Sequence, residues 1–181
     1  MARIVLGVGG SIAAYKAADL CSKLVQKGHD VEVVMTRMAL RFLRPMTFSA
    51  LTQKAVHTDA TWGRGASPAA HLKATEGADV LVVAPCTADL LGKFANGIAD
   101  DILSTTYLGA GSRVIVAPAM NPRMWAHPRV VANVARVRGD GVRFVEPGTG
   151  WVAEGETGVG RMAEPAEILA AVETVAAAPR R

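Results

Sequence analysis

The chain is poor in cysteine and has no long apolar run. Cys21 and Cys86 are the only cysteines in 181 residues, so a disulfide framework is not expected. No apolar run approaches the ~20 residues of a membrane-spanning helix. The N-terminus also lacks the apolar segment and cleavage site of a signal peptide. These absences predict a cytoplasmic protein with no membrane partner.

Clustered charge of one sign is also missing. The formal net charge is +4, and part of it lies in the terminal pair Arg180-Arg181. A nucleic-acid-binding surface would need clustered lysine and arginine together with exposed aromatic side chains. The sequence therefore predicts no nucleic-acid partner.

The common catalytic templates are absent as well. There is no Gly-x-Ser-x-Gly nucleophile elbow, no Walker loop, and no cysteine or histidine pair at metal-ligand spacing. Asp100 and Asp101 lie near a predicted helix start, where the helix dipole favours carboxylates, so we predict no metal site there. The glycine-rich opening stretch is the strongest remaining signal.

That opening stretch reads as a strand, a glycine loop and a helix. Residues 4–8 are apolar without alternation, as expected for a strand covered on both faces, and glycines stand at positions 7, 9 and 10. Ser11 is placed at the N-cap of a helix predicted from Ile12. The backbone N–H groups of residues 10–13 would then form an anion site that fits a phosphate. The alternative interpretation is that the glycines only permit close packing.

The same stretch does not meet the dinucleotide fingerprint. Ile12 stands where a third glycine is required. The next predicted strand, residues 31–35, ends in Thr36 without an acidic residue placed to hold an adenine ribose. A mononucleotide such as FMN therefore fits better than NAD.

Strands and helices alternate along the chain, with polar loops at the ends of the strands. A second helix is predicted to begin near Thr36, and residues 147–160 read as a glycine-rich loop before a terminal helix. The alternation predicts one α/β domain over residues 1–181, built on a doubly wound parallel sheet. Its buried strands are predicted at residues 4–8, 31–35, 79–85, 114–117 and 143–146.

Two loop residues leave alternatives open. Cys86 follows the third long strand and is either a nucleophile or a small residue in a tight turn. The turn is favoured because no histidine stands nearby in the sequence. His71 begins a short helix after a loop that would bring it to the active edge of the sheet, although a lone histidine is more often structural.

The longer motifs resemble those of a known family. They are Gly9-Gly10-Ser11-Ile12-Ala-Ala-Tyr-Lys, His71 eight residues before Asp79, Pro85-Cys-Thr-Ala, Asn96-Gly97-Ile-Ala-Asp-Asp and Pro118-Ala-Met-Asn-Pro-Arg-Met-Trp. Together they span nearly the whole chain and are similar to the homo-oligomeric flavin-containing cysteine decarboxylases. That family includes phosphopantothenoylcysteine decarboxylases of coenzyme A synthesis and peptidyl-cysteine decarboxylases that mature lantibiotic-like peptides.

The resemblance implies a fold, a cofactor and an assembly. The fold is a single-domain Rossmann-like (flavodoxin-like) sheet, and FMN lies between the subunits of a homotrimer, often with four trimers in a dodecamer. Carried over by motif, the flavin contacts fall on Gly10, Ser11, Ile12, Thr36, Thr87 and Asp89.

The resemblance also assigns the reacting groups. His71 becomes the active-site histidine, Asn121 grips the carboxylate end of the substrate, and Glu154 occupies the family's proton-donor position. For Trp151, covering the substrate and simple packing both remain open. The substrate contacts fall on Asn121, Met124, Trp151, Arg161 and Met162.

In this family, FMN oxidises the thiol-bearing carbon of cysteine to a thioaldehyde, and the neighbouring carboxylate then leaves as CO2. Two departures favour an enethiol product that is not reduced afterwards. Glu154 replaces a cysteine found in members that reduce the product, and Glu76 stands where many phosphopantothenoylcysteine enzymes have arginine. The chain also stops without the synthetase domain that is often fused to bacterial versions.

The sequence thus favours FMN-dependent oxidative decarboxylation of the C-terminal cysteine of a precursor peptide, with oxygen regenerating the flavin. A phosphopantothenoylcysteine decarboxylase of coenzyme A synthesis is the alternative, and the retained motif Gly158-Val-Gly160-Arg161-Met162 argues for it. A second alternative is a flavin-binding regulatory subunit without turnover.

Overall fold

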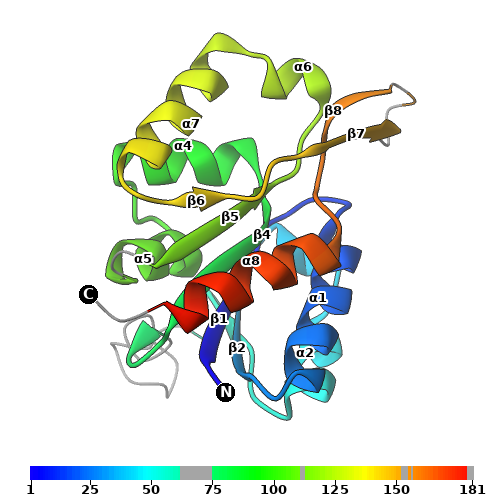
Figure 1. Cartoon of the computed structure of the whole chain (residues 1–181), viewed down its shortest axis with the longest axis vertical. Helices are drawn as coiled ribbons and strands as arrows, with labels where there is room; N and C mark the ends of the chain where they lie inside the picture. The colour runs from blue at the N-terminus through cyan, green and yellow to red at the C-terminus, as the bar shows by residue number, and fades with distance from the viewer. Residues whose placement is uncertain (62–74, 111–112, 152–154, 156, 179–181) are drawn as a thin grey trace.

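A six-stranded parallel sheet forms the centre of the molecule. The computed structural model describes residues 1–61, 75–110, 113–151, 155 and 157–178 (Figure 1). The strand order β3-β2-β1-β4-β5-β6 is that of a Rossmann sheet, which confirms the predicted doubly wound architecture. The strands are β1 (Arg3–Val8), β2 (Asp30–Met35), β3 (His57–Thr58), β4 (Val80–Cys86), β5 (Val114–Pro118) and β6 (Arg143–Phe144).

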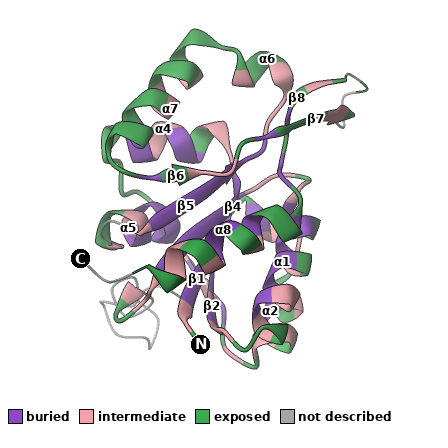
Figure 2. Ribbon diagram, in the orientation of Figure 1, coloured by how far each residue is buried: buried purple, intermediate pink, exposed green. Residues whose placement is uncertain are grey.

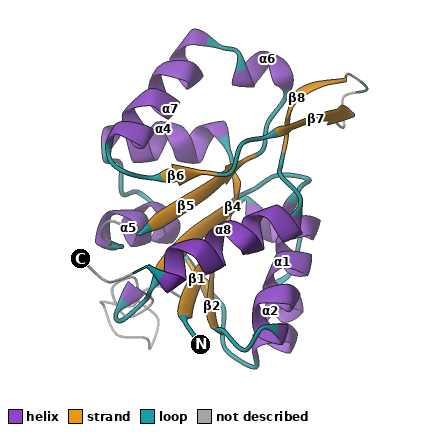
Figure 3. Ribbon diagram, viewed as in Figure 1, coloured by secondary structure: helices purple, strands orange, loops and turns teal. Residues whose placement is uncertain are grey.

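Helices cover both faces of this sheet (Figure 3). α1, α2 and α8 pack on one face, and α4, α5 and α7 pack on the other. A short 3-10 turn, η1, spans Ala39–Arg41, and α6 is a single helical turn. The helices are α1 (Ala14–Gln26), α2 (Pro45–Thr52), α4 (Ala88–Asn96), α5 (Ile102–Gly109), α6 (Pro122–Trp125), α7 (Pro128–Gly139) and α8 (Pro165–Ala177).

β4 and β5, in the middle of the sheet, are apolar throughout and buried along their whole length, as expected for strands covered on both faces (Figure 2). Ile4 and Leu6 of β1 point to the core under α1 and α8, whereas Val5 points to the core under α4 and α5. In register, Leu6 lies opposite Val33 of β2 and Val82 of β4. Because these strands pair in parallel, the carboxyl ends of β1, β2, β4 and β5 lie along one edge.

Three local predictions were wrong. α1 begins at Ala14, with Ala13 as its N-cap, because Ser11 first closes a turn in which its carbonyl accepts from the Ala14 amide. No full helix begins near Thr36, since the chain turns there only through η1. The predicted strand 143–146 is shorter than expected: Arg143–Phe144 forms β6 beside β5, and after it the Val145 amide donates to Val116 O of β5 at 2.9 Å.

The predicted glycine-rich loop is also wrong in part, because it contains an antiparallel hairpin. β7 (Gly148–Trp151) pairs with β8 (Thr157–Arg161), and the pair extends away from the main sheet (Figure 1). The Gly160 carbonyl accepts from the Met120 amide at 3.0 Å. A Cβ at Gly160 would lie 2.2 Å from the Met120 carbonyl oxygen, so glycine lets β8 pack against the loop after β5.

In the described part of the chain, no helix is long and apolar enough to cross a membrane.

Candidate functional site

Four loops meet at the carboxyl edge of the sheet, where parallel α/β sheets bind their ligands. Backbone hydrogen bonds continue the sheet into these loops. The Gly9 amide donates to Pro85 O at 3.1 Å, the Thr36 amide to Val8 O at 3.1 Å, and the Ala119 amide to Cys86 O at 3.0 Å. A Cβ at Gly9 would lie 2.4 Å from Pro85 O, so this glycine is required for the close approach. The loops after β1, β2, β4 and β5 are therefore held side by side.

The described residues line two cavities at this edge, and the larger has a volume of about 1050 Å³. Arg37, Met38, Arg41 and Phe42, from the segment after β2, line its wall. All the predicted flavin contacts also line it: Gly10, Ser11, Ile12, Thr36, Thr87 and Asp89. The structure thus brings together six residues that the sequence places on three separate loops.

Three hydroxyl groups in this cavity are oriented by backbone amides. Ser11 Oγ accepts from the Ala13 amide at 3.2 Å, and Thr36 Oγ1 accepts from the Ala39 amide at 3.1 Å. Thr87 caps α4, its Oγ1 accepting from the Leu90 amide at 3.3 Å. Because the amides use acceptor positions, each O–H group remains able to donate to a phosphate or a polyol.

A group of carboxylates in the same cavity surrounds one ammonium. Lys93 Nζ lies 2.8 Å from Asp100, 2.6 Å from Asp101 and 3.6 Å from Asp89. Although burial opposes the charge, hydrogen bonds to Asp100 and Asp101 raise the pKa of Lys93. Asp101 also caps α5, as the sequence indicates. Within the described ranges, no group of three or more metal-ligating side chains could hold an ion.

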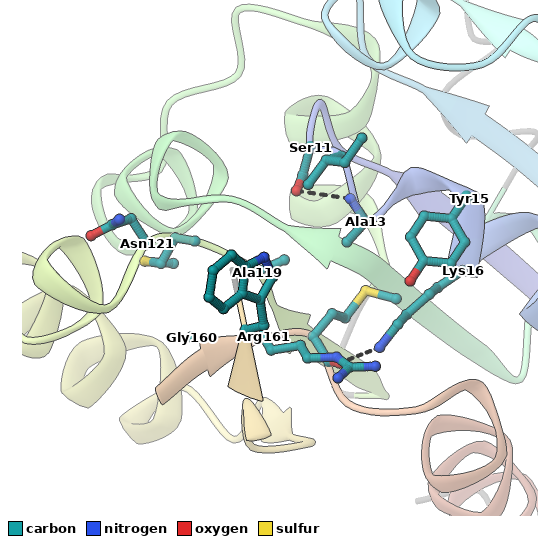
Figure 4. A pocket seen from close by; sticks show the side chains of 12 residues that line it. Ser11, Ala13, Tyr15, Lys16, Ala119, Asn121, Gly160 and Arg161 are labelled. Carbon is teal, nitrogen blue, oxygen red and sulfur yellow. Dashed lines mark hydrogen bonds between the residues drawn. The ribbon is translucent and has the colours of Figure 1, made fainter. Parts of the chain in front are cut away.

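The smaller cavity has a volume of about 410 Å³, and Figure 4 shows the side chains that line it. Tyr15 and Lys16 of α1 line one side, and Trp151, Arg161 and Met162 line the other. Both cavities are lined by Ser11, Ile12, Ala119, Met120 and Asn121. A ligand in either cavity therefore reaches the same short wall.

Asn121 stands at this junction and begins α6. Its Oδ1 accepts from the Arg123 amide at 2.8 Å, which caps the helix and fixes the side-chain amide. With Oδ1 engaged, Nδ2 carries the hydrogen-bond donors that remain. This orientation suits a group that binds a carboxylate.

The other predicted substrate contacts divide between the two cavities. Trp151 and Arg161 line the smaller cavity, and Trp151 is 68% exposed, so its side chain is not packed into the core. Met162 also lines it, although its side chain is almost wholly buried against the core under α8. Met124 lines the larger cavity, on the side of the predicted flavin contacts. His71 and Glu154 lie outside the described residues, so their roles stay predictions.

Cys86 is enclosed at the end of β4. Its side chain is fully buried, and desolvation raises the pKa of the thiol well above its usual range. A thiol in that state is a poor nucleophile, which supports the interpretation of Cys86 as a small residue in a tight turn.

Sequence reasoning missed Lys16, which is buried in α1 at the smaller cavity. Its Nζ donates to Met162 O and to Glu164 Oε1, both at 2.9 Å. A signal was present, because Lys16 stands four residues before the buried Leu20 and so shares the core-facing side of the helix. A lysine on such a face needs partners from elsewhere in the chain.

Comparisons with known proteins agree with this geometry. A model of the flavoprotein family matches residues 1–177. The chain belongs to the flavoprotein family. The bifunctional coenzyme A biosynthesis protein CoaBC of Bacillus subtilis (strain 168) is 47% identical over 170 residues, which are 94% of this chain and 42% of that protein. The chain thus spans about two fifths of the length of the curated relatives it matches.

Solved structures match nearly from end to end. A PPC decarboxylase mutant complexed with pantothenoylaminoethenethiol is 31% identical, with a TM-score of 0.86 over 96% of this chain and 97% of the other. The FMN-dependent cysteine decarboxylase SpaF is 35% identical, with a TM-score of 0.81 over 98% of both chains. These matches confirm the fold and the resemblance to flavin-dependent cysteine decarboxylases.

Proposed function

We propose that this protein is an FMN-dependent cysteine decarboxylase whose substrate is phosphopantothenoylcysteine. The observation that carries the proposal is the junction at Asn121, where a cavity suited to a flavin meets a second cavity suited to a substrate. The choice of substrate is supported by the 47% identity to the coenzyme A biosynthesis protein CoaBC over 94% of this chain. It differs from the peptide substrate that the sequence alone favours.

The residues of the larger cavity fit FMN. Its three oriented hydroxyl groups and the guanidinium groups of Arg37 and Arg41 suit a phosphate and a ribityl chain. Met38 and Phe42 offer apolar surface for an aromatic ring system. When bound, the flavin supplies a two-electron oxidation of the carbon that bears the substrate thiol.

The protein's own contribution is to position the cysteine at the junction. The Asn121 amide donates to the substrate carboxylate and holds it beside the larger cavity. The remainder of the substrate lies along the smaller cavity, between α1 and the β7–β8 hairpin. His71, expected to accept a proton during oxidation, would complete this arrangement.

Decarboxylation of a peptide that ends in cysteine is the second candidate. One observation favours it: Ala153-Glu154-Gly155 lacks the cysteine found in family members that reduce their product. Glutamate ordinarily has a pKa of about 4.3, so it is mostly ionised at neutral pH and is a weaker proton donor. An enzyme without that donor would release the enethiol.

The proposal can be tested by identifying the products that the protein forms in air. We expect the purified protein with FMN to convert phosphopantothenoylcysteine to a product lighter by one CO2, as resolved by mass spectrometry. A product lighter by two further hydrogens would support decarboxylation without reduction. Turnover of cysteine-terminated peptides alone would contradict the proposed substrate, and a protein that binds no flavin would contradict the proposed chemistry.

Asn121→Asp separates the substrate contact from the helix cap. Aspartate keeps an oxygen for the Arg123 amide but replaces the donor with a charge that repels a carboxylate. We expect kcat/KM to fall about 10- to 100-fold or more, because a hydrogen bond to a charged group is lost. The thermal unfolding temperature should change little. An unaltered kcat/KM in this variant would show that Asn121 does not bind the substrate carboxylate.

We also propose that copies of this chain meet over the larger cavity, as the family resemblance implies. Four apolar side chains that line this cavity are unusually exposed: Ile12 by 61%, Met38 by 54%, Phe42 by 44% and Met124 by 47%. Exposed apolar side chains gathered at a binding cavity favour contact with another subunit.

A further inference from the structure

The smaller cavity has a distinctive charge. Of the described residues that line it, Lys16 and Arg161 carry positive charges and none carries a negative charge. Figure 4 shows these two side chains directed toward one another, one from α1 and the other from the end of β8. The Lys16 side chain is only 6% exposed, whereas that of Arg161 is 45% exposed.

A single carboxylate outside the lining contacts both cations. Glu164 Oε1 accepts from Lys16 Nζ at 2.9 Å and from an Arg161 Nη at 2.9 Å. A hydrogen bond from Lys16 and the nearby Arg161 charge lower the pKa of Glu164, so it is ionised at neutral pH. Two positive charges against one negative charge leave the cluster with a net charge of about +1.

Hydrogen-bond donors also remain in excess. Lys16 has three N–H groups and uses two, on Met162 O and Glu164 Oε1. Arg161 has five N–H groups, and in the described part of the chain its one hydrogen bond is to Glu164. The cluster therefore has both the charge and the donors to bind an anionic group without burying an unpaired ion.

Lys16 and Arg161 differ in how they are held. Lys16 is held inside the fold by a backbone carbonyl, whereas the exposed guanidinium of Arg161 lies over Gly150 of β7. The Arg161 guanidinium is therefore accessible to a ligand from solvent, while Lys16 keeps the Glu164 carboxylate in place. A guanidinium matches a phosphate through paired hydrogen bonds, which a lysine ammonium cannot form.

We propose that Arg161 determines specificity for a phosphate monoester on the substrate, with Lys16 and Glu164 as its positioning residues. This inference rests on the proposed function, since the reacting carboxylate lies at Asn121 and the distal anion of phosphopantothenoylcysteine is its phosphate. The other interpretation is that Arg161 only ties the hairpin to the start of α8. The two interpretations differ in how the phosphorylated and unphosphorylated compounds respond to substitution.

Binding tests the proposal without requiring turnover. Calorimetric titrations of the FMN-loaded protein would compare phosphopantetheine with pantetheine. We expect the wild type to bind the phosphorylated compound at least about 10-fold more tightly, and Arg161→Gln to remove most of that preference. Arg161→Lys should retain part of it, because the charge remains. Arg138→Gln is the matched control, because it removes an exposed arginine of α7 that pairs with Glu146. It should leave the preference for the phosphorylated compound intact.

Turnover and structure complete the test. With phosphopantothenoylcysteine and pantothenoylcysteine as substrates, Arg161→Gln should raise KM for the phosphorylated compound alone and leave kcat similar. Equal wild-type affinity for the two pantetheines, or equal weakening of both in Arg161→Gln, would overturn the phosphate site while leaving decarboxylation intact. A phosphate preference in binding, with no turnover of either substrate, would support the site and overturn the proposed function. The unfolding temperature and flavin content of Arg161→Gln would identify a variant that fails through its structure.

Discussion

Single glycines in the hairpin decide how closely it approaches the site. Gly160→Ala would place a methyl group 2.2 Å from the Met120 carbonyl oxygen, and a backbone atom cannot swing away as a side chain can. We expect the free energy of unfolding to fall by about 1–3 kcal/mol, as in other overpacked positions, together with weaker substrate binding. Gly148→Ala in the same hairpin is the matched control, because nothing lies within 4 Å of its added Cβ. Equal stability of the two variants in urea would show that the hairpin is not held by this contact.

At the scale of elements, a charged cluster joins the outermost strand β3 to its neighbour β2. Glu32 of β2 contacts His57 of β3 at 3.2 Å and Lys54 at 2.9 Å. The hydrogen bond from His57, followed by that from Lys54, lowers the pKa of Glu32 to about 2, even though partial burial opposes the charge. Because the pKa is lower in the folded state, the stabilisation is complete above about pH 4.5 and is lost as the pH falls towards 2.

Glu32→Gln tests this edge cluster. The lowering of the Glu32 pKa from 4.5 to about 2 corresponds to at most about 3.4 kcal/mol. Solvent access reduces it, so we expect a loss of about 1–2 kcal/mol at pH 7. The difference from the wild type should shrink as the pH is lowered from about 4.5 towards 2 in denaturant titrations. Glu173→Gln removes a partner of Lys27 at 3.9 Å on the surface and should have almost no effect. A loss that is independent of pH would assign the effect of Glu32 to packing instead.

At the scale of the whole molecule, the four exposed apolar side chains that line the larger cavity predict self-association. The double variant Met38→Asp, Phe42→Asp would place two charges where subunits are proposed to meet. We expect a smaller particle by light scattering and a lower content of bound FMN. Val131→Asp, on an equally exposed apolar position of α7, is the control. An unchanged particle size in the double variant would locate any subunit contact elsewhere.

The larger cavity was predictable because its contacts follow strands in the sequence. Ser11, Thr36 and Thr87 each come just after a buried strand, and parallel strands bring their carboxyl ends to one edge. Lys16 and Glu164 were not identified, because their contact joins α1 to the beginning of α8 across 148 residues. The hairpin was taken for a loop because its glycine-rich strands lack the alternating apolar pattern that marks a strand.

By itself, the sequence determined the layered α/β fold, since apolar strands alternating with amphipathic helices pack stably in few other ways. It also predicted the flavin contacts at the carboxyl edge of the sheet, through motifs that resemble those of the flavin-containing cysteine decarboxylases. Only the tertiary structure decided that two cavities share Asn121, and that Lys16 and Arg161 converge on Glu164 in the smaller one. The physical reason is that charge pairing over long sequence separation leaves no periodic trace in the chain, whereas burial of strands and helices does.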